Sequence, residues 1–403
     1  MHVVIVSTYP PRKCGIATFS RDLRRAMLSA EPDAVVEIAA SLRPDGGTDE
    51  QRAEVAHTFV QADQASYQAT AEALNAIAPD AVVIEHEYGI FGGEDGQDVL
   101  ELAAALTVPY AVTLHTVLAE PSAHQAEVLE KLCAGARWVF CFSPRARTIL
   151  VEDRGVAADK VHVVAHGAPE DLVVGNGIDA DQQREELRGM GVDVDGRVLL
   201  STFGLISPGK GLETAIRAMP AIVAQHPEVH YVVAGRTHPE VVKQYGEAYR
   251  ESLEQLVAEL GVSDNVSFAN GYLSDEQLQA LLGQTQIFVT PYRSREQIVS
   301  GALTFAVAAG CAVVSTPYYY AEDIVGAGTG WLVPFEDADA LAKAVVHALD
   351  NPDELEQAHQ AAHKLGQSLA WPIIGQRVLD LLRDTEADAL ANGQDAADAL
   401  LQE

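Results

Sequence analysis

The sequence has no long apolar run and little basic charge. No hydrophobic stretch approaches the ~18 residues that a transmembrane helix needs, so we expect a globular protein. The first residues, MHVVIVS, are typical of a strand and lack the basic front and cleavage site of a secretory signal. With 27 basic against 58 acidic residues the formal net charge is −31, which argues against nucleic acid as a partner.

Cysteine is also scarce. The four cysteines have neither metal-site spacing nor the density of a disulfide framework, which favours a reducing, cytoplasmic location. No H-E-x-x-H motif, C-x-x-C motif or carboxylate cluster accompanies the histidines. We therefore expect no bound metal and no cofactor.

The basic residues that are present gather near the start of the chain, in the segment 12–25. They are Arg12, Lys13, Arg21, Arg24 and Arg25. We interpret them as a solvated face of the first helix. Contact with phosphate groups or anionic lipid headgroups at a membrane is the alternative that we do not favour.

Short apolar segments alternate with amphipathic ones along most of the 403 residues. Segments that are apolar on both faces are typical of parallel strands covered by helices. A first set covers 2–7, 80–86, 109–115, 137–143 and 160–166, and a second covers 197–204, 229–235, 265–271, 286–291 and 311–317. The two sets predict an α/β protein with two doubly wound, Rossmann-like domains.

The polar stretch 179–197 lacks strand character, and we predict the linker there. The first domain then covers 1–190 and the second 193–371. Residues 391–403 end an acidic, Ala-rich tail that we expect to fray.

One predicted strand end carries a lysine at the mouth of a helix. Strand 197–204 runs through Gly204 into a loop with Gly209, and Lys210 stands where a helix over 212–225 begins. Ligands of open α/β sheets bind outside the carboxyl ends of strands, and a helix N-terminus with a lysine suits a diphosphate. A surface lysine beside a turn is the alternative.

The first domain has candidate site residues at its own strand ends. Gly15, in TYPPRKCGIATFSRDL, would let a ligand approach the backbone, although the three-glycine spacing of a dinucleotide site is missing. His86 and His115 end two strands. A single histidine at a strand end is usually structural, but two at corresponding positions strengthen the case for a functional role. The loop 85–96, EHEYGIFGGEDG, is our candidate for acceptor binding, with a purely structural loop as the alternative.

Several segments follow one another in an order that is more specific than any single motif. They are YPPRKCGIATFSRDL, His86, VTLH, VVAHGAPED, FGLISPGKGLETAIRAM, VSFANGYLSDEQLQALL, AVAAGCAVVST, GTGWLVPFEDADALAKAV and LAWPIIGQRVLDLL. With them the chain resembles the retaining glycosyltransferases of family 4 over nearly its whole length. The resemblance implies the GT-B fold, with its two domains facing each other across a cleft. It also implies that the chain returns to the first domain at Trp371, through a crossover helix over 372–390.

The resemblance also implies an activity and roles for matching residues. The activity is transfer of a hexosyl unit, with retention, from a nucleoside diphosphate sugar to a hydroxyl acceptor on a sugar, a glycan or a small molecule. Lys210 would neutralise the diphosphate and His115 would touch the transferred sugar. Donor-binding candidates are Gly15, Ile16, Gly204, Gly209, Arg236, Gln297, Ser300 and Gly301, and acceptor-binding candidates are His86, Glu87 and Tyr88.

Two departures from the family pattern concern the donor. Leu205 replaces an arginine that usually precedes the lysine by five residues. The usual pair of glutamates is replaced by Gln297 and Phe305, or in another register by Glu296 and Thr304. Phe305 cannot bond a ribose, and we expect it to pack in the domain core. Candidates for the missing phosphate charge are Arg236, Arg293 and Arg295, with an exposed surface residue as the equal alternative for each.

Because the usual ribose-binding glutamate is replaced, two other functions remain open. A sugar phosphorylase or phosphosugar-using enzyme of the same fold would need no ribose contact. A non-catalytic sugar-binding relative would need no turnover.

Overall fold

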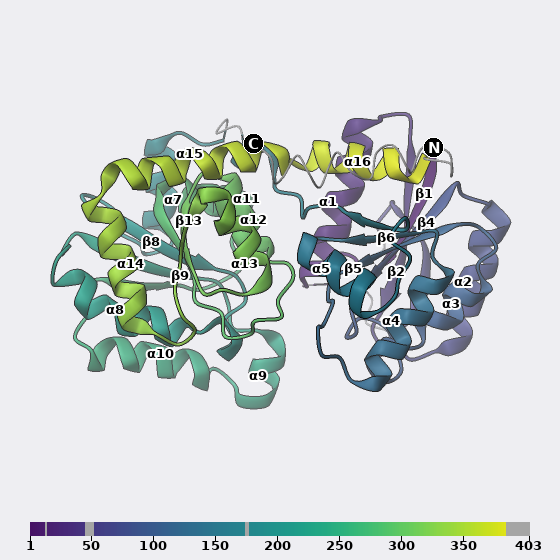
Figure 1. Ribbon diagram of the computed structural model, residues 1–403, viewed down its shortest axis with the longest axis horizontal. Helices are drawn as coiled ribbons and strands as arrows, with labels where there is room; N and C mark the ends of the chain where they lie inside the picture. Colours follow the sequence, from purple (N-terminus) through teal and green to yellow (C-terminus); the bar gives the residue numbers. More distant parts are fainter. Residues whose placement is uncertain (13, 45–51, 174–176, 384–403) are drawn as a thin grey trace. The chain divides into compact units, whose positions relative to one another are not determined.

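The computed structural model describes residues 1–12, 14–44, 52–173 and 177–383, which form two compact units (Figure 1). The N-terminal unit comprises residues 1–167 and the returning segment 371–383, and the C-terminal unit comprises residues 168–370. Within the described ranges, no helix combines the length and apolarity needed to cross a membrane.

A parallel sheet forms the centre of the N-terminal unit, with the strand order β3-β2-β1-β4-β5-β6-β7 among the described residues. The strands are β1 (His2–Ser7), β2 (Val35–Leu42), β3 (Val55–Val60), β4 (Ala81–His86), β5 (Tyr110–Leu114), β6 (Trp138–Cys141) and β7 (Val161–Val163). The five strands predicted from the sequence are confirmed. β2 and β3 were not predicted, and most side chains of β3 are only half-buried, so the sequence there lacks a continuous apolar run.

The C-terminal unit repeats this arrangement with the strand order β10-β9-β8-β11-β12-β13. The strands are β8 (Val198–Phe203), β9 (Val229–Ala234), β10 (Val266–Ala269), β11 (Thr285–Thr290), β12 (Ala312–Ser315) and β13 (Gly330–Leu332). Again the five predicted strands are confirmed, and the short β13 was missed. Because all described strands of a sheet run parallel, their carboxyl ends lie at one edge, where ligands of such sheets bind.

Helices cover both sheets (Figure 1). The N-terminal unit contains α1 (Gly15–Ala30), α2 (Gln64–Ile77), α3 (Val99–Ala105), α4 (Ala123–Gly135), α5 (Pro144–Thr148) and α16 (Trp371–Arg383). The C-terminal unit contains α6 (Glu170–Val173), α7 (Ala180–Gly189), α8 (Leu212–Val223), α9 (Pro239–Tyr245), α10 (Ala248–Glu259), α11 (Asp275–Gln284), α12 (Gly301–Ala308), α13 (Tyr319–Ile324), α14 (Ala338–Asp350) and α15 (Pro352–Ser368).

The predicted linker over 179–197 is wrong, because this segment folds into the C-terminal unit. Asp179 and Gln182 form a capping box that starts α7, and Leu187 is fully buried. Leu187 packs in a cluster with Val194 and residues of β8 and α11. The boundary therefore lies between Gly167 and Ala168 instead of near residue 190.

The chain returns to the N-terminal unit in α16, which packs along α1 (Figure 1). A Cβ atom on Gly375 would lie 2.4 Å from the carbonyl carbon of Ala26, so the two helices approach closely only because residue 375 is glycine. Arg383 forms an ion pair with Glu31. The predicted crossover is thus a helix over Trp371–Arg383; residues 384–390 and the predicted frayed tail lie outside the described residues.

Candidate functional site

The loop after β8 is shaped by a glycine at its end. A 3-10 helix covers Pro208–Lys210, and Gly211 follows with φ 62° as the cap of α8. A Cβ atom at Gly211 would lie 2.0 Å from the carbonyl oxygen of Pro291, at the end of β11. Only glycine meets both requirements, so the sequence itself determines how the chain enters α8.

The side chain of Lys210 is held in place rather than free in solvent. Its Nζ atom donates a hydrogen bond to Tyr292 Oη at 2.7 Å and lies 3.9 Å from the centre of the Tyr292 ring. Tyr292, just beyond β11, is only 1% exposed. The sequence therefore identified the lysine but not its partner, which also stands at a strand end.

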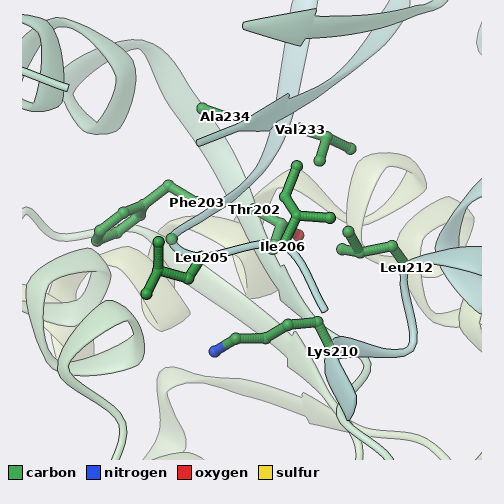
Figure 2. Close-up of a pocket in the computed structure, with 9 residues that line it drawn as sticks. Thr202, Phe203, Leu205, Ile206, Lys210, Leu212, Val233 and Ala234 are labelled. Carbon is green, nitrogen blue, oxygen red and sulfur yellow. The ribbon is translucent and has the colours of Figure 1, made fainter. Parts of the chain in front are cut away.

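Lys210 lines a small pocket at the carboxyl ends of β8 and β9. The other lining residues are Thr202, Phe203, Gly204, Leu205, Ile206, Leu212, Val233 and Ala234, so Lys210 is the one charged residue of this lining. Figure 2 shows the lysine pointing toward the side where Leu205 and Phe203 lie. Leu205 thus lines the pocket with an apolar side chain at the position where the family resemblance predicts a second cation.

The strand ends beside this pocket approach each other at two glycines. Gly204 has φ 123°, and a Cβ atom on Gly235 would lie 1.9 Å from the Gly204 carbonyl oxygen. Gly209, in the same loop, has no such neighbour: no heavy atom lies within 4 Å of an added Cβ. Gly204 therefore has a structural reason for its identity, whereas Gly209 has none in the described residues.

Ser300 links the pocket to a second helix N-terminus. It caps α12 by accepting from the backbone N–H of Leu303 at 3.3 Å, and its Oγ lies 3.4 Å from Tyr292 Oη. Gly301 is the first residue of this helix. Gln297, by contrast, donates from Nε2 to the Val299 carbonyl oxygen at 3.0 Å, a bond that stabilises its own loop.

Phe305 does not pack in the core as predicted. It is half-buried, and its ring stacks on Phe203 with centroids 6.3 Å apart and an interplanar angle of 23°. In the alternative register, Thr304 is fully buried and its hydroxyl pairs with Ser300 O at 3.0 Å and Tyr320 Oη at 2.7 Å. Neither Phe305 nor Thr304 offers a carboxylate, and the pocket lining at Phe203 is aromatic.

Three arginines were predicted as replacement cations, and each has its own partner. Arg293 pairs with Glu213 at 3.6 Å and with Glu336 at 3.2 Å, and Arg295 pairs with Glu322 at 3.1 Å. The guanidinium of Arg236 lies 5.2 Å from the centre of the Tyr272 ring. The acidic neighbours already balance the charge of the first two arginines.

The N-terminal unit buries a histidine–glutamate pair at the edge of its sheet. His115 Nε2 lies 2.8 Å from Glu85 Oε2, and Thr113 donates to Glu85 Oε1 at 3.3 Å. Glu85 is fully buried and His115 is 8% exposed. The short contact between the two buried side chains fixes the orientation of the His115 ring.

His86 cannot face an acceptor, which corrects the prediction for this residue. Its side chain is fully buried, and neither ring nitrogen has a hydrogen-bond partner in the described residues. The ring stacks on Phe91 with centroids 6.4 Å apart. Burial, and to a lesser extent the nearby His115, lowers the pKa of His86 to about 3.

Glu87 and Tyr88 remain half-exposed at the end of β4. Glu87 accepts from the Thr116 hydroxyl at 2.5 Å and from the Tyr88 backbone N–H at 2.9 Å. The Tyr88 hydroxyl donates to the Gln125 carbonyl oxygen at 3.4 Å. Glu87 and Tyr88, unlike His86, thus remain partly accessible.

Two residues of the acceptor loop, Glu94 and Asp95, lie with His124 of α4 in the group of side chains best placed for a cation in the described residues. His124 already uses Nδ1 with Asp95 at 2.9 Å and Nε2 with Gln97 at 3.1 Å. The hydrogen bond with Asp95 raises the pKa of His124. That the protein binds no metal remains our prediction.

Helix α1 begins at Gly15, and the backbone at its N-terminus is accessible. Cys14 caps it, with Sγ accepting from Ala17 N at 3.4 Å, and no heavy atom lies within 4 Å of an added Cβ on Gly15. Gly15 is exposed and Ile16 half-buried, which leaves the backbone accessible.

Two arginines of the basic segment 12–25 have partners within the N-terminal unit, whereas Arg25 is exposed. Arg21 pairs with Asp22 at 2.7 Å, and Arg24 donates to the Val36 carbonyl oxygen at 2.8 Å. Lys13 lies outside the described residues.

Comparison with known proteins gives a family match for the C-terminal unit. The family model of the glycosyl transferases group 1 matches residues 183–365. The GDP-mannose-dependent monoacylated alpha-(1-6)-phosphatidylinositol monomannoside mannosyltransferase of Corynebacterium glutamicum is 27% identical over 183 residues, 44% of each chain. The lipopolysaccharide core biosynthesis mannosyltransferase LpcC of Rhizobium leguminosarum is 32% identical over 158 residues, 39% of this chain and 42% of the relative. The chain thus spans about half the length of the curated relatives it matches.

Solved structures match over nearly the whole chain. Anabaena HepE in complex with UDP has a TM-score of 0.74 at 17% identity, covering 95% of this chain and 99% of that one. A glycosyltransferase from Rickettsia africae has a TM-score of 0.76 at 14% identity, covering 97% and 99%. These similarities confirm the predicted GT-B fold class.

Proposed function

We propose that this chain, whose residues 183–365 belong to the glycosyl transferases group 1, transfers a hexosyl unit from a nucleoside diphosphate sugar to a hydroxyl acceptor. The observation that carries the proposal is the fixed ammonium group of Lys210 at the mouth of α8. The relatives' names include GDP-mannose-dependent mannosyltransferases, so GDP-mannose is the first donor to test. Their acceptors favour a hydroxyl group on a sugar or glycolipid.

In the proposed step, the bond between the anomeric carbon and the diphosphate oxygen breaks, and the acceptor oxygen bonds to the same carbon with retention. The acceptor proton passes to a phosphate oxygen of the leaving nucleoside diphosphate, so no side-chain base is needed. Negative charge grows on the leaving group. Lys210 and the first-turn N–H groups of α8 would stabilise that charge as preorganised hydrogen-bond donors.

In the N-terminal unit, we assign a sugar hydroxyl to His115. The buried side chain of Glu85 fixes the orientation of the ring, so the remaining edge of the imidazole is presented in one direction. Glu87 and Tyr88 are the proposed acceptor contacts. Gly15 and Ile16 open α1 and are the proposed contacts of this unit with phosphate.

The test is donor turnover with nucleotide binding as an independent readout. Purified protein is incubated with GDP-mannose, UDP-glucose and a panel of sugar acceptors, and the released nucleoside diphosphate is measured. Thermal shifts with GDP, UDP, ADP and inorganic phosphate are recorded in parallel, since a ligand that binds only the folded state raises its melting temperature. The proposal requires stabilisation by a nucleoside diphosphate and release of that nucleotide from the matching sugar donor.

A phosphosugar-using enzyme is the second candidate, favoured by the aromatic stack of Phe203 and Phe305 where the resemblance predicts a ribose-binding carboxylate. In that case inorganic phosphate, and not a nucleotide, would stabilise the protein. Stabilisation by a free sugar alone would indicate a binding protein without turnover.

A further inference from the structure

Tyr292 joins three parts of the C-terminal unit. Its backbone follows β11, and its hydroxyl meets Lys210 from the β8 loop at 2.7 Å and Ser300 at the start of α12 at 3.4 Å. The residue is 82 positions from the lysine in sequence. The same hydroxyl thus contacts the cation and the cap of a second helix whose N-terminus belongs to the proposed donor site.

The ring of Tyr292 is held by two close contacts. One face stacks on the fully buried Tyr318, with centroids 5.0 Å apart and an interplanar angle of 16°. The ammonium of Lys210 lies 3.9 Å from the ring centre. The backbone is tied down as well, because the Thr316 hydroxyl donates to the Tyr292 carbonyl oxygen at 2.6 Å.

The hydrogen bonds around this hydroxyl have a defined direction. An ammonium group can only donate, so the oxygen of Tyr292 accepts from Lys210. The phenolic proton is then free to point toward Ser300 Oγ, which itself accepts from the Leu303 backbone N–H. The chain of bonds orders a flexible lysine whose side chain would otherwise sample many rotamers.

We propose that Tyr292 is a positioning residue of the donor site, which holds the Lys210 ammonium where the leaving diphosphate gains charge. The inference rests on the proposed function of Lys210. A preorganised cation needs no reorganisation when charge develops, whereas a mobile one must first be immobilised by the substrate. The loss should therefore appear in kcat more than in KM.

The test compares Tyr292→Phe with Tyr320→Phe. The first change keeps the stacked ring and its contact with the ammonium but removes the hydroxyl. The second removes another buried tyrosine hydroxyl of this unit, one that pairs with Thr304 Oγ1 at 2.7 Å instead of a lysine. We expect kcat for the nucleotide-sugar donor to fall about tenfold in Tyr292→Phe with a smaller change in KM. Tyr320→Phe should retain the kcat of the unmodified protein at a comparable melting temperature.

A double-mutant cycle with Lys210→Ala tests whether Tyr292 acts through the lysine. Once Lys210 is alanine, Tyr292→Phe should cause no further loss. Equal losses in both tyrosine variants, no loss in Tyr292→Phe, or full additivity with Lys210→Ala would each overturn the positioning role. A wrong assignment of Lys210 to the donor site would give a different result, because Lys210→Ala itself would then leave GDP binding and donor turnover unchanged.

Discussion

His115 Nε2 and Glu85 Oε2 lie 2.8 Å apart at the ends of neighbouring strands β5 and β4, and solvent scarcely reaches either side chain. A hydrogen bond between two buried side chains fixes the orientation of the imidazole ring. The pair therefore presents one edge of His115 in a fixed orientation.

Replacing this carboxylate by an amide should impair transfer more than nucleotide binding. For Glu85→Gln we expect about tenfold lower donor turnover, because an amide holds the imidazole ring less firmly and a buried hydrogen bond of this kind contributes ~1 kcal/mol or more. His115→Ala should likewise reduce sugar transfer more than affinity for free GDP, measured by calorimetry. The matched control is Glu37→Gln, which changes a half-exposed glutamate 2.9 Å from His2 in the same unit. Parallel losses of GDP affinity and turnover would contradict the assignment of His115 to the sugar.

Lys210→Ala removes the charged residue of the β8 pocket and should lower turnover by ~10²-fold or more, since transition-state donors of this kind are typically worth ~3 kcal/mol. The fold should persist, because the loop geometry depends on Gly211 and not on the lysine. Lys343→Ala, an exposed lysine on α14, is the control and should keep full activity. Turnover equal to that of the unmodified protein would remove Lys210 from the site.

Phe305→Glu tests the altered glutamate pair. The ring is half-buried and stacked on Phe203, so we expect the free energy of unfolding to fall by about 1–2 kcal/mol, less than for a fully buried phenylalanine. We expect no gain in GDP affinity. Phe305→Leu, which keeps apolar contact, should lose less stability in urea titrations. Tighter GDP binding by the glutamate variant would show that the ribose pocket has persisted around this position.

Two buried histidines should make the protein sensitive to acid. Burial lowers the pKa of His86 from 6.5 to about 3 and that of His166 to about 4. Below pH 6.5 the unfolded chain therefore binds more protons than the folded chain, and stability is lost as the pH falls from about 6.5 toward about 4. Each histidine should contribute a slope of ~1.4 kcal/mol per pH unit within this window.

His86→Phe should reduce that slope, measured by urea unfolding between pH 4.5 and pH 7.5. It also removes two buried nitrogens without partners in the described residues and keeps a ring against Phe91, so stability at neutral pH should rise. His363→Phe, at an exposed position on α15, should leave the slope as it is. An unchanged slope in His86→Phe would assign the acid sensitivity to other groups.

The strands, and the place of Lys210 among them, could be predicted from the sequence because they depend on local patterns. Apolar segments predicted the centre of both sheets, and the strand-loop-helix order placed Lys210 and His115 at strand ends. Segments with weaker patterns were missed: β3 is half-exposed, and α7 is a polar helix whose burial depends on Leu187 meeting the C-terminal unit. For that reason the domain boundary lies between Gly167 and Ala168 and not near residue 190, as predicted from the sequence.

Other features were decided only by tertiary structure, because they join residues that are distant in sequence. Tyr292 reaches Lys210 across 82 positions, and Glu85 reaches His115 across 30, through strand register that no local pattern specifies. Burial had the same effect on His86, whose strand-end position predicts access to a ligand although packing against Phe91 encloses it completely. Sequence thus determined which residues stand at the strand ends, and packing determined which of them remain available, because side-chain access depends on neighbours from other elements.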